Sequence, residues 1–229
     1  MHRMVDLVQW VGRNRHALLF FSLIATIAIG PLLSLLGSNG SLLNVLLGLT
    51  LLAASLMPSH AHAQVQKRGF VVFVALAIAL GLAPIRSGLG ETGPITLALW
   101  SAIAFFGATR ALRYAMSSRR VDRDHLLAAL NTYLLVGVFL GSTWVALEGA
   151  MPGALVFGGA PLKNLSLPDG IYFSFVTLAT LGYGDISPAT PIARGLAVFE
   201  AIFGQLYLAV MVARLVSLRI AAETQDTPP

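Results

Sequence analysis

The sequence contains no cysteine and little charge. The absence of cysteine from its 229 residues excludes disulfide bonds and thiolate metal sites. Charged residues make up only 11% of the chain and hydrophobic residues 56%, a balance typical of membrane proteins rather than soluble domains. The sequence has no nucleophile triad, phosphate-binding loop or zinc motif, so we expect neither an enzyme nor a cofactor. The net charge of +5 lies mainly between apolar runs, which favours a membrane partner over nucleic acid or a soluble substrate.

Six apolar runs occupy most of the chain. They approach or exceed the roughly 20 residues that a helix needs to cross a bilayer. Proline, glycine or basic residues separate them. The pattern predicts an all-α membrane protein with six transmembrane helices. The runs cover residues 17–36, 41–57, 69–83, 94–114, 125–147 and 194–218.

Basic residues are distributed unevenly between the alternate connections of these runs. If the N-terminus is cytoplasmic, the inner segments hold twelve Lys and Arg residues and the outer segments three. This is the positive-inside pattern. We therefore expect a multi-pass protein of the plasma membrane with both termini in the cytoplasm. The inner residues are Arg3, Arg13, Arg15, Lys67, Arg68, Arg110, Arg113, Arg119, Arg120, Arg123, Arg214 and Arg219, and the outer ones are Arg86, Lys163 and Arg194.

Two features near residue 60 allow a second interpretation. Ala61-His62-Ala63 resembles a signal-peptide cleavage site, but two apolar runs precede it and the first is too long for a signal peptide. We therefore expect residues 17–36 to remain as a membrane span. His60 and His62 belong to a polar connector or, as the alternative, to a metal or proton sensor. No third ligand lies nearby in the sequence, which weakens the metal alternative.

Residues 177–185, Thr-Leu-Ala-Thr-Leu-Gly-Tyr-Gly-Asp, form the most distinctive stretch of the chain. Glycine adopts positive φ without a Cβ clash, so Gly182 and Gly184 at alternate positions allow successive peptide planes to flip. The carbonyl groups can then face one way, with the Thr180 hydroxyl at the inner end. Such a row of oxygens can replace the hydration shell of a potassium ion. A glycine-rich turn is the simpler alternative, but a predicted helix precedes this stretch and an apolar run follows it.

Residues 166–218 resemble the pore module of the tetrameric potassium channels. They share a short amphipathic helix, the Thr-Leu-Gly-Tyr-Gly-Asp sequence, Pro188 and a long apolar helix with a glycine in its middle. Leu181 stands where the family usually has valine or isoleucine, and Tyr183 matches the selective members. The resemblance implies a homotetramer with a re-entrant pore helix and a selectivity filter. It assigns the filter to Thr180, Leu181, Gly182, Tyr183 and Gly184, with K⁺ bound at the first four as the permeant ion.

A short helix is expected directly before the filter. Ser166 suits its N-cap, and Pro168 and Asp169 suit its first turn. We expect the helix to end near Ala179, with the negative end of its dipole directed at the pore centre.

The filter needs support from behind, because irregular backbone at membrane depth must be covered by protein or line water. Tyr172, Phe173 and Tyr183 are candidates for this packing. The resemblance also implies that Asp185 bonds back to the pore helix, with Tyr172 or Phe173 in place of the family's usual tryptophan. A solvated Asp185 that concentrates cations at the outer mouth is the alternative.

The sixth run carries an ionisable residue and a glycine. A charged group inside a span is costly and indicates a functional site, so Glu200 either attracts cations in the cavity or lies behind the filter. We expect the second arrangement, with Glu200 bonded to Thr177 or to another pore-helix group. Gly204 either matches the family's hinge glycine or permits close helix packing. One helical stripe is expected to line the conduction path, and it consists of Gln205, Leu208, Val212 and Val216.

The first four runs differ from a voltage sensor. A sensor helix carries about 3–4 gating charges per subunit, whereas the fourth run has only Arg110 and Arg113 at its cytoplasmic end. We therefore expect weak or no voltage dependence. The predicted organisation is a cytoplasmic segment (1–16), a four-helix transmembrane domain (17–120), a pore domain (121–220) and a short cytoplasmic tail (221–229).

These patterns together predict a potassium-selective channel with passive conduction. The alternatives are a non-selective cation channel, a component of a potassium transporter, and a non-conducting membrane sensor or assembly subunit. Such transporters carry four imperfect pore loops in one chain, whereas this sequence has one loop with both glycines. Ion flux through a purified oligomer would distinguish a channel from a sensor.

Overall fold

The computed structural model describes residues 14–35, 94–117, 122–162 and 164–225. The second and third apolar runs, with His60 and His62 between them, lie outside these residues. The described helices are α2 (Arg15–Leu35), α5 (Pro94–Met116), α6 (Arg123–Ala150), α7 (Leu167–Leu178) and α8 (Pro191–Gln225), and the strands are β1 (Leu155–Phe157), β2 (Ala160–Pro161) and β3 (Ile186–Pro188).

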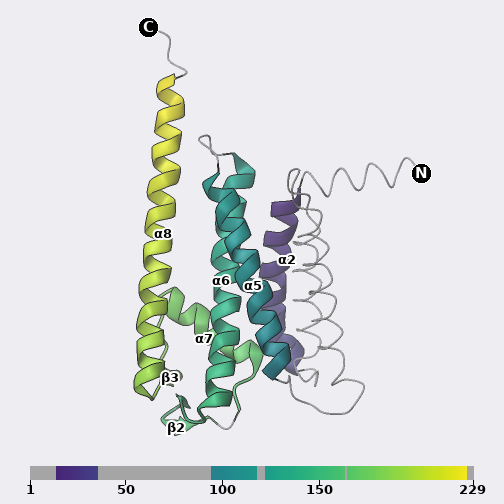
Figure 1. The fold of residues 1–229 in the computed structure, drawn as a ribbon, viewed down its shortest axis with the longest axis vertical. Helices are drawn as coiled ribbons and strands as arrows, with labels where there is room; N and C mark the ends of the chain where they lie inside the picture. Colours follow the sequence, from purple (N-terminus) through teal and green to yellow (C-terminus); the bar gives the residue numbers. More distant parts are fainter. Residues whose placement is uncertain (1–13, 36–93, 118–121, 163, 226–229) are drawn as a thin grey trace, which may run out of the picture.

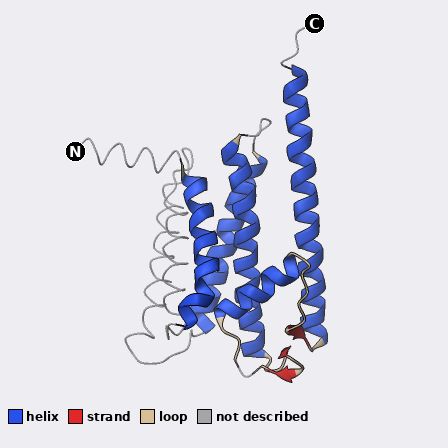
Figure 2. Cartoon of the chain, turned by 180° about the vertical axis from the view of Figure 1, so that it is seen from behind, coloured by secondary structure: helices blue, strands red, loops and turns tan. Residues whose placement is uncertain are grey.

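Four long helices run lengthwise, and the short helix α7 lies obliquely between α6 and α8 (Figure 1). The central element is α6, since it packs against α2, α5, α7 and α8. The strands lie at one end of the molecule, together with the end of α6 and the start of α8 (Figure 2). We call this the strand end. The end of α5 and the start of α6 lie at the opposite end.

The predicted runs at 17–36, 94–114, 125–147 and 194–218 correspond to α2, α5, α6 and α8. Among the described residues, the helices Arg123–Ala150 and Pro191–Leu218 are long and apolar enough to cross a membrane. The last helix, α8, continues to Gln225, past the predicted end at residue 218. The described part of the chain is therefore mostly helical, and the total of six spans stays a prediction.

Glycines bring α6 and α7 into close contact. A Cβ atom at Gly141 would lie 2.6 Å from the Cα of Ile171, and one at Gly137 would lie 2.4 Å from the ring of Phe175. From the other side, a Cβ atom at Gly170 would lie 2.6 Å from the Gly141 carbonyl oxygen. Small residues let helix backbones approach closely in membrane proteins. The backbone of α6 therefore sets where α7 lies.

Three short strands form an antiparallel sheet in the order β2-β1-β3. Val156 lies opposite Ser187 in the pairing of β1 with β3, and opposite Pro161 in the pairing with β2. The sequence predicts only helices and loops, and a glycine- and proline-rich loop before the pore helix, so the sheet is a difference from expectation. Strands of two or three residues show no period-two pattern, and their pairing depends on distant segments of the chain.

A buried carboxylate joins α6 to this sheet. Glu148 is 5% exposed, and its two oxygens accept hydrogen bonds from the backbone N–H groups of Gly153 and Leu155 at 2.7 and 2.8 Å. Because backbone amides in a turn lack secondary-structure partners, this pair of bonds fixes the path from α6 into β1.

Candidate functional site

Helix α7, the predicted pore helix, begins and ends where its caps predict. The Ser166 hydroxyl accepts from the backbone N–H of Asp169 at 3.3 Å and donates to the Asp169 carboxylate at 2.5 Å. Pro168 lies in the first turn, where a missing N–H costs no helical hydrogen bond. At the other end, the Ala179 N–H donates to the carbonyl of Phe175 at 3.0 Å. The helix runs from the strand end to partway along α8, and the chain then returns to the strand end (Figure 1).

The backbone from Thr180 to Gly184 alternates in handedness. The φ angles of Thr180, Gly182 and Gly184 are +56°, +57° and +79°, whereas Leu181 and Tyr183 have no positive φ. Glycine adopts such angles freely, but a β-branched threonine does so only at a conformational cost. Alternating conformations direct successive N–H groups to one side of the backbone. The carbonyl groups then share the opposite side.

Amide groups in the first half of this stretch point toward the pore helix. The N–H of Thr180 donates to the Thr177 carbonyl at 3.0 Å. Those of Leu181 and Gly182 donate to the Val176 carbonyl at 2.9 and 3.4 Å. Since these three amides lie on the side of α7, an alternating backbone is expected to direct the carbonyls of the same residues away from α7.

Residues 180–184 are all exposed in the single chain. Leu181 and Tyr183 are 56% and 67% exposed. Tyr183, which the sequence predicts behind the filter, therefore does not pack there within its own chain.

Tyr172 makes the contact with Asp185. Its hydroxyl donates to Asp185 Oδ2 at 2.8 Å and connects α7 to the residue after the filter. This hydrogen bond lowers the pKa of Asp185 and raises the pKa of Tyr172 to about 12. Phe173, the other predicted partner, has no hydrogen-bond donor on its side chain and is buried, at 4% exposed.

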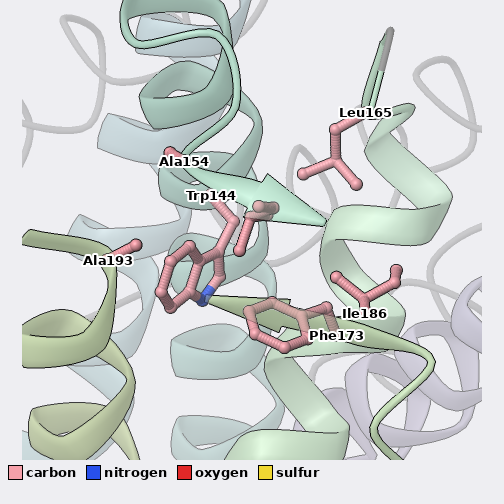
Figure 3. Packing of buried hydrophobic residues seen from close by; sticks show 7 residues of the cluster. Trp144, Ala154, Leu165, Phe173, Ile186 and Ala193 are labelled. Carbon is pink, nitrogen blue, oxygen red and sulfur yellow. The ribbon is translucent and has the colours of Figure 1, made fainter. Parts of the chain in front are cut away.

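Phe173 packs against Trp144 instead. The two rings meet edge to face with centroids 4.9 Å apart (Figure 3). They belong to an apolar cluster that joins α6, α7, α8 and two strands of the sheet. Its buried members are Trp144, Ala154, Leu155, Leu165, Phe173, Ile186 and Ala193. The cluster supports the strand-end part of the pore helix on the side of α6.

Glu200 belongs to α8, lies where this helix meets α6 and α7, and is 0% exposed. Its Oε1 accepts from the Ser174 hydroxyl at 2.5 Å, and its Oε2 accepts from the Trp144 indole N–H at 2.6 Å. The Thr177 hydroxyl, the predicted partner of Glu200, instead donates to the Phe173 carbonyl at 2.9 Å. The sequence did not single out Trp144 or Ser174, because neither carries a local signal and they lie 56 and 26 residues from Glu200.

Gly204 and Gln205 face the C-terminal end of α7. A Cβ atom at Gly204 would lie 2.4 Å from the carbonyl oxygen of Leu178. Gln205 Nε2 donates to the same oxygen at 3.5 Å. The tight contact fits the packing interpretation of Gly204, and a hinge at this position stays a prediction.

The remaining residues of the predicted pore-lining stripe point away from their own chain. Leu208, Val212 and Val216 are 38%, 58% and 53% exposed. The packed face of α8 carries Met211, which is buried, and Tyr207, whose hydroxyl donates to the Ala129 carbonyl of α6 at 2.6 Å. The stripe therefore borders whatever lies beside α8 in an assembly.

Comparison with protein families finds one matching description. Residues 130–219, which contain most of α6 and all of α7, the filter and the apolar part of α8, match the family model described as an ion channel. The match covers the residues that form the site described above. No solved structure matches the chain at a significant level.

Several curated proteins are similar to this part of the chain. Protein LctB of Bacillus caldotenax is 32% identical over 105 residues, which cover 44% of this chain and 76% of LctB. Two pore potassium channel c of Oryza sativa is 34% identical over 85 residues, or 37% of this chain and 18% of the rice protein. Potassium channel subfamily K member 5 of Homo sapiens is 32% identical over 60 residues, 26% of this chain and 12% of the human protein. The chain thus matches less than a fifth of the length of these two channels.

Proposed function

Because the chain belongs to the pore-loop potassium channel family, we propose that it conducts potassium ions passively and selectively across a membrane. One observation carries the proposal. The backbone of residues 180–184 alternates in handedness while its first amides bond to the pore helix. This arrangement suits carbonyl oxygens that replace the water around a dehydrated K⁺. The proposed ion sites lie at Thr180, Leu181, Gly182 and Tyr183.

The charge distribution around this row of oxygens favours a cation. The C-terminal end of α7 carries the negative end of the helix dipole, and it lies beside the first filter residues. At the other end of the filter, the lowered pKa of Asp185 keeps its carboxylate ionised. A fixed negative charge near a pore entrance raises the local concentration of cations.

The proposed channel is a homotetramer. One chain supplies one row of oxygens, and a cage around an axial ion needs several rows related by closed symmetry. The exposed side chains of Leu181 and Tyr183 at the filter, and of Phe199, Ile202 and Leu206 on α8, offer apolar surface to neighbouring copies. Four copies is the number that the family resemblance implies.

The proposed location is the plasma membrane, with six spans and both termini in the cytoplasm. In the described part, Arg113 lies in the last turn of α5 and Arg123 at the start of α6, and these helix ends lie opposite the strands. Arg194 lies near the start of α8 at the strand end. The excess of basic residues away from the strands supports an outward-facing filter. The bilayer and other copies of the chain are the proposed partners.

Weak or absent voltage dependence is part of the proposal. The arginines of α5 are Arg110 and Arg113, both within its last two turns. Charges at the edge of a membrane sense little of the transmembrane potential, so they would add little gating charge.

Purified protein in liposomes tests the proposed function. With K⁺ on one side and Na⁺ on the other, we expect a reversal potential set by K⁺, and we expect Gly182→Asp to abolish the current. Equal permeability to the two ions would contradict selectivity and favour a non-selective channel. A well-folded oligomer without flux would contradict conduction altogether.

A further inference from the structure

Burial of the Glu200 carboxylate in the apolar helix α8 costs free energy. Glu200 lies within the apolar part of α8 and is 0% exposed. A buried carboxylate is tolerated only when its oxygens are hydrogen-bonded. Both oxygens are bonded, one to Ser174 of α7 and the other to Trp144 of α6. Three helices of the pore region therefore meet at one side chain, and we call Trp144, Ser174 and Glu200 the Glu200 junction.

A second contact between α7 and α8 lies one helical turn beyond the junction. Ser174 meets Glu200, and four residues further along each helix Leu178 meets Gly204. Because the two contacts are separated by four residues on each helix, α7 and α8 run in the same direction past each other over this turn. The first contact is a hydrogen bond, and the second is a backbone approach without room for a Cβ atom. Together they fix both the height and the rotation of α7 against α8.

The part of α7 between these two contacts is hydrogen-bonded to the filter. Val176 and Thr177 supply the carbonyls that accept the N–H groups of Thr180, Leu181 and Gly182. Any shift of α7 along α8 would move these acceptors and, through them, the filter carbonyls. Selective coordination of an ion depends on the positions and number of such carbonyls.

We propose that Glu200 is a positioning residue for potassium selectivity, which acts through Ser174 and Trp144 by holding the pore helix α7 against α8 and α6. This inference rests on the proposed channel function. Glu200 does not touch the ion path, since it is covered on all sides by its own chain. The part of α8 from its start at Pro191 to Gly204 then moves with the filter as one unit.

The test measures the ratio of K⁺ to Na⁺ permeability from reversal potentials in liposomes. Glu200→Leu leaves the indole N–H and the serine hydroxyl unpaired in a buried site, and we expect the ratio to fall roughly tenfold. Ser174→Ala and Trp144→Phe should each lower it by a smaller factor. Adding Ser174→Ala to Glu200→Leu should have little further effect, because the partner is already gone.

Two variants separate positioning from general loss of stability. Glu200→Gln keeps both bonds, since its amide oxygen can accept from Trp144 while its NH₂ group donates to Ser174. It should therefore retain most of the wild-type ratio. Glu148→Gln alters a comparable buried carboxylate whose partners are the backbone of residues 153 and 155 rather than α7. It should lower the thermal stability and leave the ratio unchanged.

The outcomes distinguish this inference from the proposed function. A wild-type protein without potassium selectivity overturns the channel proposal. A selective wild type whose folded Ser174→Ala and Trp144→Phe variants keep its permeability ratio overturns the role of Glu200 alone. These two variants decide the question even when Glu200→Leu fails to assemble.

Discussion

The Tyr172 hydroxyl donates to Asp185 at 2.8 Å, so one hydrogen bond closes the loop from the pore helix through the filter and back. The bond favours the ionised carboxylate and lowers the pKa of Asp185. It therefore stabilises the folded loop at pH values above the pKa of Asp185 in the unfolded chain. This contribution is lost as the pH falls through the lowered pKa of the folded state.

Tyr172→Phe should make the outer end of the filter more sensitive to acid. Without the hydroxyl, the pKa of Asp185 returns toward its ordinary value, so protonation begins at a higher pH. We expect the current to decline at a higher outer pH than in the wild type when the outer solution is titrated from about pH 7 to 3. Asp185→Asn should remove this acid-dependent step. Coincident titration curves for Tyr172→Phe and the wild type would refute the link.

Gly204→Ala should disrupt the contact between α8 and α7. The added Cβ would lie 2.4 Å from the Leu178 carbonyl oxygen, which belongs to backbone and cannot rotate away. Overpacking of this kind costs about 1–3 kcal/mol, and thermal unfolding of the purified oligomer would measure the loss. Gly195→Ala is the matched control on the same helix, since nothing lies within 4 Å of its Cβ position.

The control substitution should change the stability in the opposite direction. Alanine is the better helix former, so Gly195→Ala should raise the stability by up to about 1 kcal/mol. Equal effects of the two substitutions would show that the Gly204 contact does not limit the packing of α7 on α8.

The hydroxyl of Thr180 should contribute to ion binding at the inner end of the filter. Thr180→Ala removes this oxygen, and Thr180→Ser keeps it, while both leave a non-glycine residue at a φ of +56°. We expect Thr180→Ala to weaken K⁺ binding and Thr180→Ser to stay near the wild-type affinity, as measured by calorimetric titration of the purified protein. An equal K⁺ affinity for the alanine variant and the wild type would remove Thr180 from the ion sites.

Tyr207→Phe should weaken the attachment of α8 to α6 without changing selectivity. The hydroxyl donates to the Ala129 carbonyl at 2.6 Å, and this contact involves neither α7 nor the filter. Loss of one such bond costs about 0.5–1.5 kcal/mol. We expect a lower thermal stability with a wild-type permeability ratio, and a reduced ratio would show that the contact also supports the filter.

Local signals in the sequence predicted the helix that precedes the filter. Ser166, Pro168 and Asp169 mark its start, and α7 runs from Leu167 to Leu178 with its C-cap at Ala179, as expected. These signals are local because capping depends on side chains within one turn of the helix end. Gly182 and Gly184 likewise have the positive φ angles that glycine at these positions predicts. Thr180 also has a positive φ, which its residue type does not predict.

Such local signals do not predict contacts between segments that are distant in the sequence. Glu200 stood out because it is charged within an apolar helix, but Trp144 and Ser174 look like ordinary members of their helices. Only the packing of α6, α7 and α8 brings them to its two oxygens. The same holds for β1 and β3, whose three residues each become strands only through their pairing.

Thallium substitution tests the central claim most directly, because Tl⁺ resembles K⁺ and its density is easily recognised. A structure of the purified oligomer in Tl⁺ should show four copies of residues 180–184 around one axis, with ion density between the oxygens of Thr180, Leu181, Gly182 and Tyr183. A map in which this segment lies away from the symmetry axis, or borders it without bound ions, would contradict the account.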